Sequence, residues 1–348
     1  MLAVAIGVAV ALSSSTSKPD PMPKDAKVAA LYLQGRDHAA QRNAAGIARA
    51  VTELEAVTRA EPDFAPAWSA LAETSLLSRE FGSLSDGVAF ERARRSAERA
   101  LALDPSLAAA HRALGFVAYW WEHDRARAAK AFQTALKLAP ADGQTHFWYG
   151  NILADNGEHA AARRELDAAR LAQPGSVAID TDYAWALWSA GETKAAYDRL
   201  NAIVARAPGF AVAHDSLGDM RLADGDYAGY LLELTTRQEA RAEPELAEKL
   251  TAFRAAQASG GLPALQKAML ERALADQATA PFPDHAFAAF VTSVAGDRAA
   301  LLDVLARADK GREVWGSSGY VRRIAERWKD DKQVSDSLAR RRPANIES

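Results

Sequence analysis

The sequence contains no cysteine, and this absence excludes several kinds of chemistry at once. Among its 348 residues there is no thiol to form a structural disulfide, to act as a catalytic nucleophile or to bind zinc. The lack of cysteine is compatible with an oxidising compartment but does not establish one.

The sequence also lacks the motifs of the common catalytic sites. It has no glycine-rich phosphate loop, no His-Glu-x-x-His helix and no Gly-x-Ser-x-Gly elbow. Two short polar stretches with histidine, residues 122–124 and 158–159, fall at expected turns, so we expect them to be solvated rather than to bind a metal. We therefore expect a protein that is not an enzyme, with no cofactor.

Neither sign of charge is in large excess. The 42 Lys and Arg residues against 45 Asp and Glu residues leave a net charge of −3. This balance gives no reason to expect nucleic acid or an acidic membrane face as the main partner. The basic run at residues 340–342 is more simply interpreted as a solvated tail.

Residues 1–12, MLAVAIGVAVAL, form an uninterrupted apolar run. They are fewer than the roughly 20 residues that a helix needs to cross a bilayer. The polar stretch that follows indicates a flexible linker over residues 13–25. We interpret residues 1–12 as a membrane anchor or signal segment; a cleaved signal, a truncated membrane helix and a mis-assigned start all remain open. We expect a membrane-tethered chain with periplasmic repeats, the alternative being a soluble periplasmic or cytoplasmic protein.

Prolines recur at a constant spacing through the middle of the chain. Pro140, Pro174 and Pro208 recur with a period of 34, and Pro105 precedes Pro140 by 35. At fixed positions before each of the three later prolines, twelfth, eighth and fifth, the same residue types return: Ala128, Ala162 and Ala196; Phe132, Leu166 and Leu200; Ala135, Ala169 and Ile203. A period of this length predicts a repeated helical hairpin whose second helix is the same each time.

The first helix of each expected hairpin carries a large residue followed by a small one, namely Leu114-Gly115, Tyr149-Gly150 and Tyr183-Ala184. A glycine at this position would allow two helices to approach closely. The turns carry Gly157 and Gly191, where glycine would supply the positive φ that ends a helix.

These residues resemble the tetratricopeptide repeat, whose pattern runs Trp, Leu-Gly, Tyr, Ala, Phe, Ala, Pro. The resemblance implies an all-α fold, a tetratricopeptide-type helical-hairpin solenoid with a right-handed superhelix, over residues 26–241. Residues 242–342 would form divergent helical hairpins and a C-terminal cap. At the place of the family's first Trp, this chain has Trp68, His111, His146, Asp180 and His214. We expect the histidines to be interface residues, with pH sensing as the alternative.

A second resemblance involves residues 32–36 and 61–68, which read YLQGR and EPDFAPAW. They resemble the repeat regions of membrane-anchored bacterial winged-helix regulators and of related membrane cyclases. In that family a membrane helix and a polar linker precede the repeats. The resemblance implies a sensory repeat region of a signalling or transcription-regulatory membrane protein, here without its output domain.

The first resemblance also implies a binding surface. In the family, fixed positions of the first helices line the concave face. Those positions here hold Arg112, Phe116, Tyr119 and Trp120, then Phe147, Trp148, Asn151 and Asp155, then Thr181, Asp182, Trp185 and Trp188, then Asp215 and Asp219. Aromatic walls with sparse polar groups suit a peptide or a small ligand. We therefore expect a protein-interaction scaffold that binds a protein segment or small ligand in this groove. The alternative is that these rings pack between neighbouring helices.

Overall fold

The structure is a computed structural model that describes residues 21–81, 84–241, 243–278 and 283–343. About 80% of the described residues are helical and none of them forms a strand, which confirms the all-α prediction. None of the helices in these ranges is long and apolar enough to cross a membrane. The apolar run at residues 1–12 lies outside the described residues.

Helix contacts divide the chain into two units, Met1–Ala113 and Leu114–Ser348. The first unit contains the hairpins α1 (Ala26–Ala40) with α2 (Ala44–Ala60) and α3 (Ala65–Phe81) with α4 (Asp86–Leu103). Part of its core is formed by Tyr32, Leu54, Val57, Ala67 and Leu71. The unit also includes the beginning of α5 (Ala108–Trp120).

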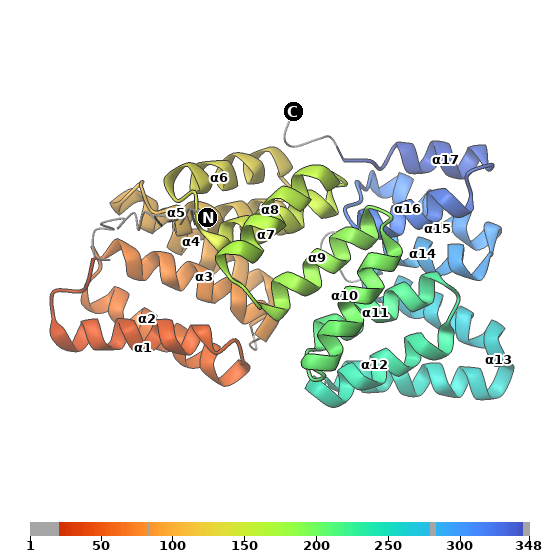
Figure 1. Ribbon diagram of the computed structural model, residues 1–348, viewed down its shortest axis with the longest axis horizontal. Coiled ribbons are helices and arrows are strands. Elements are labelled where there is room, and N and C mark those ends of the chain that lie inside the picture. The colour runs from red at the N-terminus through yellow and green to blue at the C-terminus, as the bar shows by residue number, and fades with distance from the viewer. Residues whose placement is uncertain (1–20, 82–83, 242, 279–282, 344–348) are drawn as a thin grey trace, which may run out of the picture. The chain divides into compact units, whose positions relative to one another are not determined.

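The second unit continues the hairpins and adds a divergent C-terminal group (Figure 1). Its helices are α6 (Arg125–Leu138), α7 (Gly143–Asp155), α8 (His159–Ala172), α9 (Val177–Ser189), α10 (Thr193–Arg206), α11 (Ala211–Ala223), α12 (Tyr227–Arg241), α13 (Pro244–Ala278), α14 (Ala286–Ala295), α15 (Arg298–Gly311), α16 (Ser318–Arg327) and α17 (Lys332–Ala339). The long α13 is broken at Gly261, whose φ of 64° and ψ of −154° are not helical.

The residues that recur before each proline form the interiors of the hairpins. All nine of them, at the twelfth, eighth and fifth positions before Pro140, Pro174 and Pro208, are at most 1% exposed. Gly150 explains why the first helix needs a small residue, because a Cβ there would lie 2.7 Å from Cγ of Leu166. The turn residues Gly157 and Gly191 have φ values of 85° and 92°, as the sequence pattern predicts.

The place of the family's first Trp has a structural function in four repeats. A ring nitrogen lies within hydrogen-bonding distance of the carbonyl oxygen of the proline that precedes the helix: Trp68 and Pro62 at 2.9 Å, His111 and Pro105 at 3.0 Å, His146 and Pro140 at 2.9 Å, and His214 and Pro208 at 2.9 Å. Nδ1 of His146 and of His214 also lies 2.6 Å from a carboxylate oxygen of the second helix, on Glu165 and Glu233 respectively. These histidines therefore tie the two helices of a hairpin together.

Asp180 occupies the same place in the remaining repeat, with the opposite charge. It pairs with Arg170 at 3.0 Å, Arg199 at 3.6 Å and Arg206 at 2.5 Å. Arg199 follows Asp180 at the same separation, 19 residues, as Glu165 follows His146 and Glu233 follows His214. The bridge between the helices is therefore kept while the two partners exchange charge.

The C-terminal helices of the second unit pack back onto earlier hairpins. Helix α16 contacts α14 and α17, and it also contacts α7 and α9, the first helices of two repeats (Figure 1). The predicted groove residues of α7 and α9 therefore have neighbours that come from far along the chain.

Candidate functional site

The predicted groove residues are distributed over both units. Arg112 belongs to the first unit, where its side chain is buried and donates a hydrogen bond of 2.7 Å from Nε to Glu73. All the other predicted groove residues belong to the second unit. Any site that these residues form together therefore lies within the second unit.

The large rings of the second unit form an aromatic surface that consists of Phe116, Trp120, Trp148, Trp185 and Trp188. Ring centroids of Phe116 and Trp148 lie 4.8 Å apart, so α5 and α7 contribute to one cluster. Those of Trp185 and Trp188, both on α9, also lie 4.8 Å apart. All five rings belong to helices that are the first of their hairpins.

The rings of this surface differ greatly in exposure. Trp120 is 38% exposed, whereas Trp188 is only 1% exposed. Trp148 and the neighbouring Phe147 are buried as well, at 8% and 6%. Only part of the aromatic surface can therefore be reached by a partner.

The C-terminal segment, residues 312–343, covers the α9 end of the aromatic surface. The Tyr320 ring lies 5.7 Å from Trp185 and 6.2 Å from Trp188, and it stacks on Phe290 at 4.7 Å. The Arg323 guanidinium lies over the Trp188 ring at 4.8 Å. At this end the rings pack against other side chains of the same protein. This corresponds to the alternative in which the rings pack between helices.

Two predicted polar residues also bind the C-terminal segment. Asp155 accepts hydrogen bonds from the backbone N–H of Ser317 at 2.7 Å and from the Tyr119 hydroxyl at 3.2 Å. Asp219 accepts one from the Tyr320 hydroxyl at 2.5 Å. Burial raises the pKa of Asp155 to about 6 and that of Asp219 to about 7.

The other predicted polar residues make contacts between helices. Asn151 donates a hydrogen bond of 2.6 Å to Asp182, which joins α7 to α9. Asp215 pairs with Arg237 of α12 at 2.7 Å. Thr181 is fully buried and donates its hydroxyl to the Val177 carbonyl of its own helix.

A cavity of about 530 Å³ opens beside the exposed end of the aromatic surface. Tyr119 and Trp120 form its apolar wall, and Asp155, Arg125 and Asp284 bring charges of both signs. Burial is the main reason that the pKa of Asp284 is raised. An aromatic wall with a few charged groups around a cavity of this size is typical of a ligand site.

The backbone around this cavity is also unusual. Among the described residues, four that are not glycine have a positive φ, and three of these line the cavity: His123 at 54°, Arg312 at 53° and Ser317 at 51°. Such conformations cost about 1–3 kcal/mol each and gather at binding and active sites. The cavity is therefore the best candidate for a functional site on this surface.

The sequence did not indicate the contribution of the C-terminal segment to this site. Ser317 stands 162 residues from Asp155, and Tyr320 stands 101 residues from Asp219. No periodic signal in the sequence links Tyr320 to a repeat so far away. Only the fold brings these residues together.

Comparison with known proteins supports the repeat assignment. A family model described as the tetratricopeptide repeat matches residues 122–181. No curated protein matches the chain significantly.

Solved structures with a similar fold include IFIT1 in a monomeric mutant form with m7Gppp-AAAA. Its TM-score is 0.52 at 13% identity, and the match covers 84% of this chain and 76% of that one. Pseudomonas aeruginosa pilF gives a TM-score of 0.44 at 14% identity, covering 70% of this chain and 97% of that one. YrrB, described as a TPR protein with an unusual peptide-binding site, gives a TM-score of 0.37 at 20% identity, and the match covers 57% of this chain and 97% of that one. Residues 122–181 therefore match the tetratricopeptide repeat, and the helical hairpins on either side of them continue the same helix–turn–helix arrangement along the chain.

Proposed function

We propose that this protein is a non-catalytic interaction scaffold that binds a segment of a partner protein at Trp120 and the adjoining cavity of about 530 Å³. Tetratricopeptide repeat proteins mediate protein interactions. The observation that carries the proposal is the 38% exposure of Trp120 at the edge of that cavity. An exposed tryptophan offers a large contact area at a low cost in side-chain entropy, which is why tryptophan is enriched at interfaces.

The site is smaller than the groove that the sequence predicts. Tyr320 and Arg323 cover Trp188, so a partner could not contact the α9 end without displacing them. The α5 end remains accessible to a partner. There the ring centroids of Phe116 and Trp120 lie 6.2 Å apart and those of Tyr119 and Trp120 lie 4.8 Å apart. We infer that one side chain of the partner segment enters the cavity while its neighbours lie on Trp120.

The volume of the cavity also fits a small ligand, because ligand pockets generally measure about 300–1,000 Å³. A partner segment is favoured because Trp120 lines the cavity and is still 38% exposed, so its ring offers contact area that a segment larger than the cavity could cover. The polar groups Asp155 and Arg125 would orient either occupant.

Quantitative capture experiments with matched variants test the proposal. The wild-type protein, Trp120→Ala and Leu171→Ala are used as bait in a lysate of the source organism, and bound proteins are compared by mass spectrometry. Leu171 is a suitable control because it is 84% exposed on α8 and does not line the cavity. A partner that is lost from Trp120→Ala and retained by Leu171→Ala is then bound as a purified protein to both variants by calorimetry.

Thermal melting separates binding from stability in the same set. Trp120→Ala should melt close to the wild-type temperature, whereas Trp188→Ala should lose about 3–5 kcal/mol of stability, as buried tryptophans do. If Trp120→Ala lost as much stability as Trp188→Ala and retained every partner, the ring would be part of the core and the proposal would fail.

We also propose that residues 1–12 tether the chain to a membrane or direct its export. The support is the uninterrupted apolar sequence of these residues, followed by a polar stretch. A sensory role for the repeats in a signalling protein is the second candidate and rests on the resemblance of residues 32–36 and 61–68. Cell fractionation of the protein with and without residues 1–20 tests the tether, since a soluble full-length protein in the cytoplasm would contradict it.

A further inference from the structure

A second cavity, of about 850 Å³, lies on another side of the C-terminal segment. The turn between α7 and α8 and the start of α8 form one wall, and α16 with the stretch after α17 forms the opposite wall. Five basic residues line it: His159, Arg322, Lys329, Arg341 and Arg342. This cavity shares Asp155 and Gly316 with the first cavity, but not Trp120.

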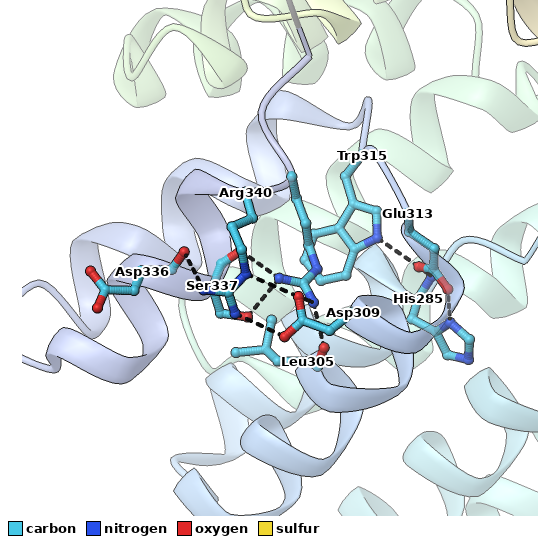
Figure 2. Close-up of polar contacts among 9 residues, drawn as sticks. His285, Leu305, Asp309, Glu313, Trp315, Asp336, Ser337 and Arg340 are labelled. Carbon is cyan, nitrogen blue, oxygen red and sulfur yellow. Dashed lines mark hydrogen bonds and ion pairs between the residues drawn. The ribbon is translucent and has the colours of Figure 1, made fainter.

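Arg341 builds the floor of this cavity. Its side chain is only 1% exposed, which makes the predicted solvated tail at residues 340–342 wrong for this residue. It donates hydrogen bonds to the Ser337 hydroxyl at 2.6 Å and to the carbonyls of Ser337 and Leu305, and it pairs with Asp309 at 2.9 Å. Figure 2 shows Ser337, Leu305 and Asp309 converging from α17 and α15 on this point.

Arg341 also holds Trp315 in place. The Arg341 guanidinium lies 5.1 Å over the Trp315 ring, and the Trp315 backbone N–H donates to the Arg341 carbonyl at 3.0 Å. The Trp315 indole N–H donates to Glu313 at 2.8 Å, as Figure 2 also shows. Two of these contacts join Trp315 to Arg341 and the third joins it to Glu313, so the Trp315 ring, which is 1% exposed, is packed behind the cavity and supports its lining.

The carboxylates that line the cavity are already engaged. Asp155 accepts the two hydrogen bonds described above, and Glu326 accepts from Arg322 at 2.7 Å and from Arg323 at 3.0 Å. The positive charge of Arg341 is likewise matched by Asp309.

The remaining cations have no such partners. Within the described part of the chain, neither Lys329 nor Arg342 forms an ion pair. Burial, and after it the nearby Arg322 charge, lowers the pKa of His159. An anion in the cavity would therefore be attracted by at least two uncompensated charges.

We propose that this cavity binds an organic carboxylate, with its acidic groups at Lys329 and Arg342 and its apolar part against Val321 and Ala325. The apolar wall favours a carboxylate on a hydrocarbon body over a bare inorganic anion, and the volume fits a ligand of small-molecule size or a few peptide residues. The acid could be a free molecule or the acidic side chains of a peptide. This site is independent of the function proposed for Trp120.

Binding is tested by calorimetry on the purified protein with four probes. Benzylsuccinate represents a free acid and the blocked peptide acetyl-Glu-Glu-Phe-amide represents acidic side chains. The peptide acetyl-Gln-Gln-Phe-amide removes the charge, and inorganic phosphate represents a bare anion. We expect at least one of the two carboxylate probes to bind, the neutral peptide not to bind, and phosphate to bind more weakly; the tighter of the acids identifies the source.

The variants are Lys329→Gln with Arg342→Gln, and Lys130→Gln as the control. All three side chains are exposed, and Lys130 on α6 does not line this cavity. The double variant should weaken binding at least about tenfold, since one charge-assisted contact is worth about 1.5 kcal/mol or more. The control should bind as the wild type does, and neither should change the melting temperature.

NMR titration of His159 gives a second readout. Its pKa should rise when the acid is bound, because an anion opposes the effect of Arg322. In the double variant the same probe concentration should leave the pKa unchanged. The proposal is overturned if neither acid binds, if the double variant binds as well as the wild type, or if phosphate binds as tightly as both acids.

Discussion

The glycines at the helix contact of two hairpins, Gly150 and Gly218, lead to a prediction whose sign differs between repeats. In Gly150→Ala the new methyl carbon would lie 2.7 Å from Cγ and 3.0 Å from Cδ2 of Leu166, which is fully buried. In Gly218→Ala the nearest atoms lie 3.5 Å away, on Glu233 and Tyr230, which is ordinary contact. The two glycines stand at the same place of the repeat, so they form a matched pair.

The magnitudes follow from two opposing terms. Alanine is favoured over glycine within a helix by about 0.8–1.0 kcal/mol at either position. Overpacking a filled interior costs about 1–3 kcal/mol, and only Gly150 has to bear that cost. We therefore expect Gly218→Ala to raise the free energy of unfolding by about 1 kcal/mol. The free energy of unfolding of Gly150→Ala should be lower than that of Gly218→Ala by about 1–3 kcal/mol.

Urea unfolding followed by circular dichroism at the helix band measures both variants beside the wild type. Repeat arrays do not always unfold in one step, so amide hydrogen exchange in α7 and α11 provides a local measurement of the same effect. If both alanines stabilised the protein equally, the close approach at Gly150 would not limit packing. A loss of stability in Gly218→Ala would equally refute the reasoning.

Three further predictions concern single contacts. Burial raises the pKa of Asp219 to about 7, so between about pH 4 and pH 7 the native state holds more protons than the unfolded state. The stability of the protein should therefore fall as the pH rises through this window. When melting is measured across the window, the fall should be smaller in Asp219→Asn. The charges that face this group are Asp215, Lys249 and Arg237. His214→Ala should cost about 2–4 kcal/mol in urea unfolding because it removes the contacts to Glu233 and to the Pro208 carbonyl, while Glu233 keeps Arg221 at 3.0 Å. His111→Ala, which loses only the contact to the Pro105 carbonyl, should cost about 1 kcal/mol. Removing residues 1–20 should leave the melting temperature unchanged, because the backbone N–H groups of Lys24 and Asp25 donate to the Glu61 carboxylate at 3.0 Å and fix the start of the first hairpin. A lower melting temperature would mean that the removed residues belong to the core.

The parts of the fold that the sequence predicts are those fixed by contacts within one repeat. Leu166 of α8 meets Gly150 of α7, the helix just before it, and Glu165 meets His146 in the same hairpin. Such short separations return at each period, so the pattern itself contains the evidence for them. The function of histidine at the first position could have been inferred as well, because in two repeats a glutamate follows it at the separation at which Arg199 follows Asp180 in another.

Contacts between distant segments leave no periodic trace. The run at residues 340–342 has the composition of an exposed tail, yet Arg341 is buried because Asp309 and two carbonyl oxygens accept from its two terminal nitrogens. A sequence shows that an arginine is present but not that acceptors surround its terminal nitrogens. The same limit applies to Asp155, whose partner Ser317 lies in the C-terminal segment.

The aromatic surface shows what this difference means for the site. Phe116 and Trp185 occupy the same position in their repeats, counted from the preceding proline, so the period predicts the same environment for both. The structure gives them different neighbours: Phe116 contacts Trp148 of the next repeat, whereas Trp185 lies against Tyr320 of the C-terminal segment. A binding surface inferred from repeat positions therefore has to be tested against every segment that can fold back over it. In this protein that test leaves the α5 end, with Trp120, as the part of the surface that a partner can reach.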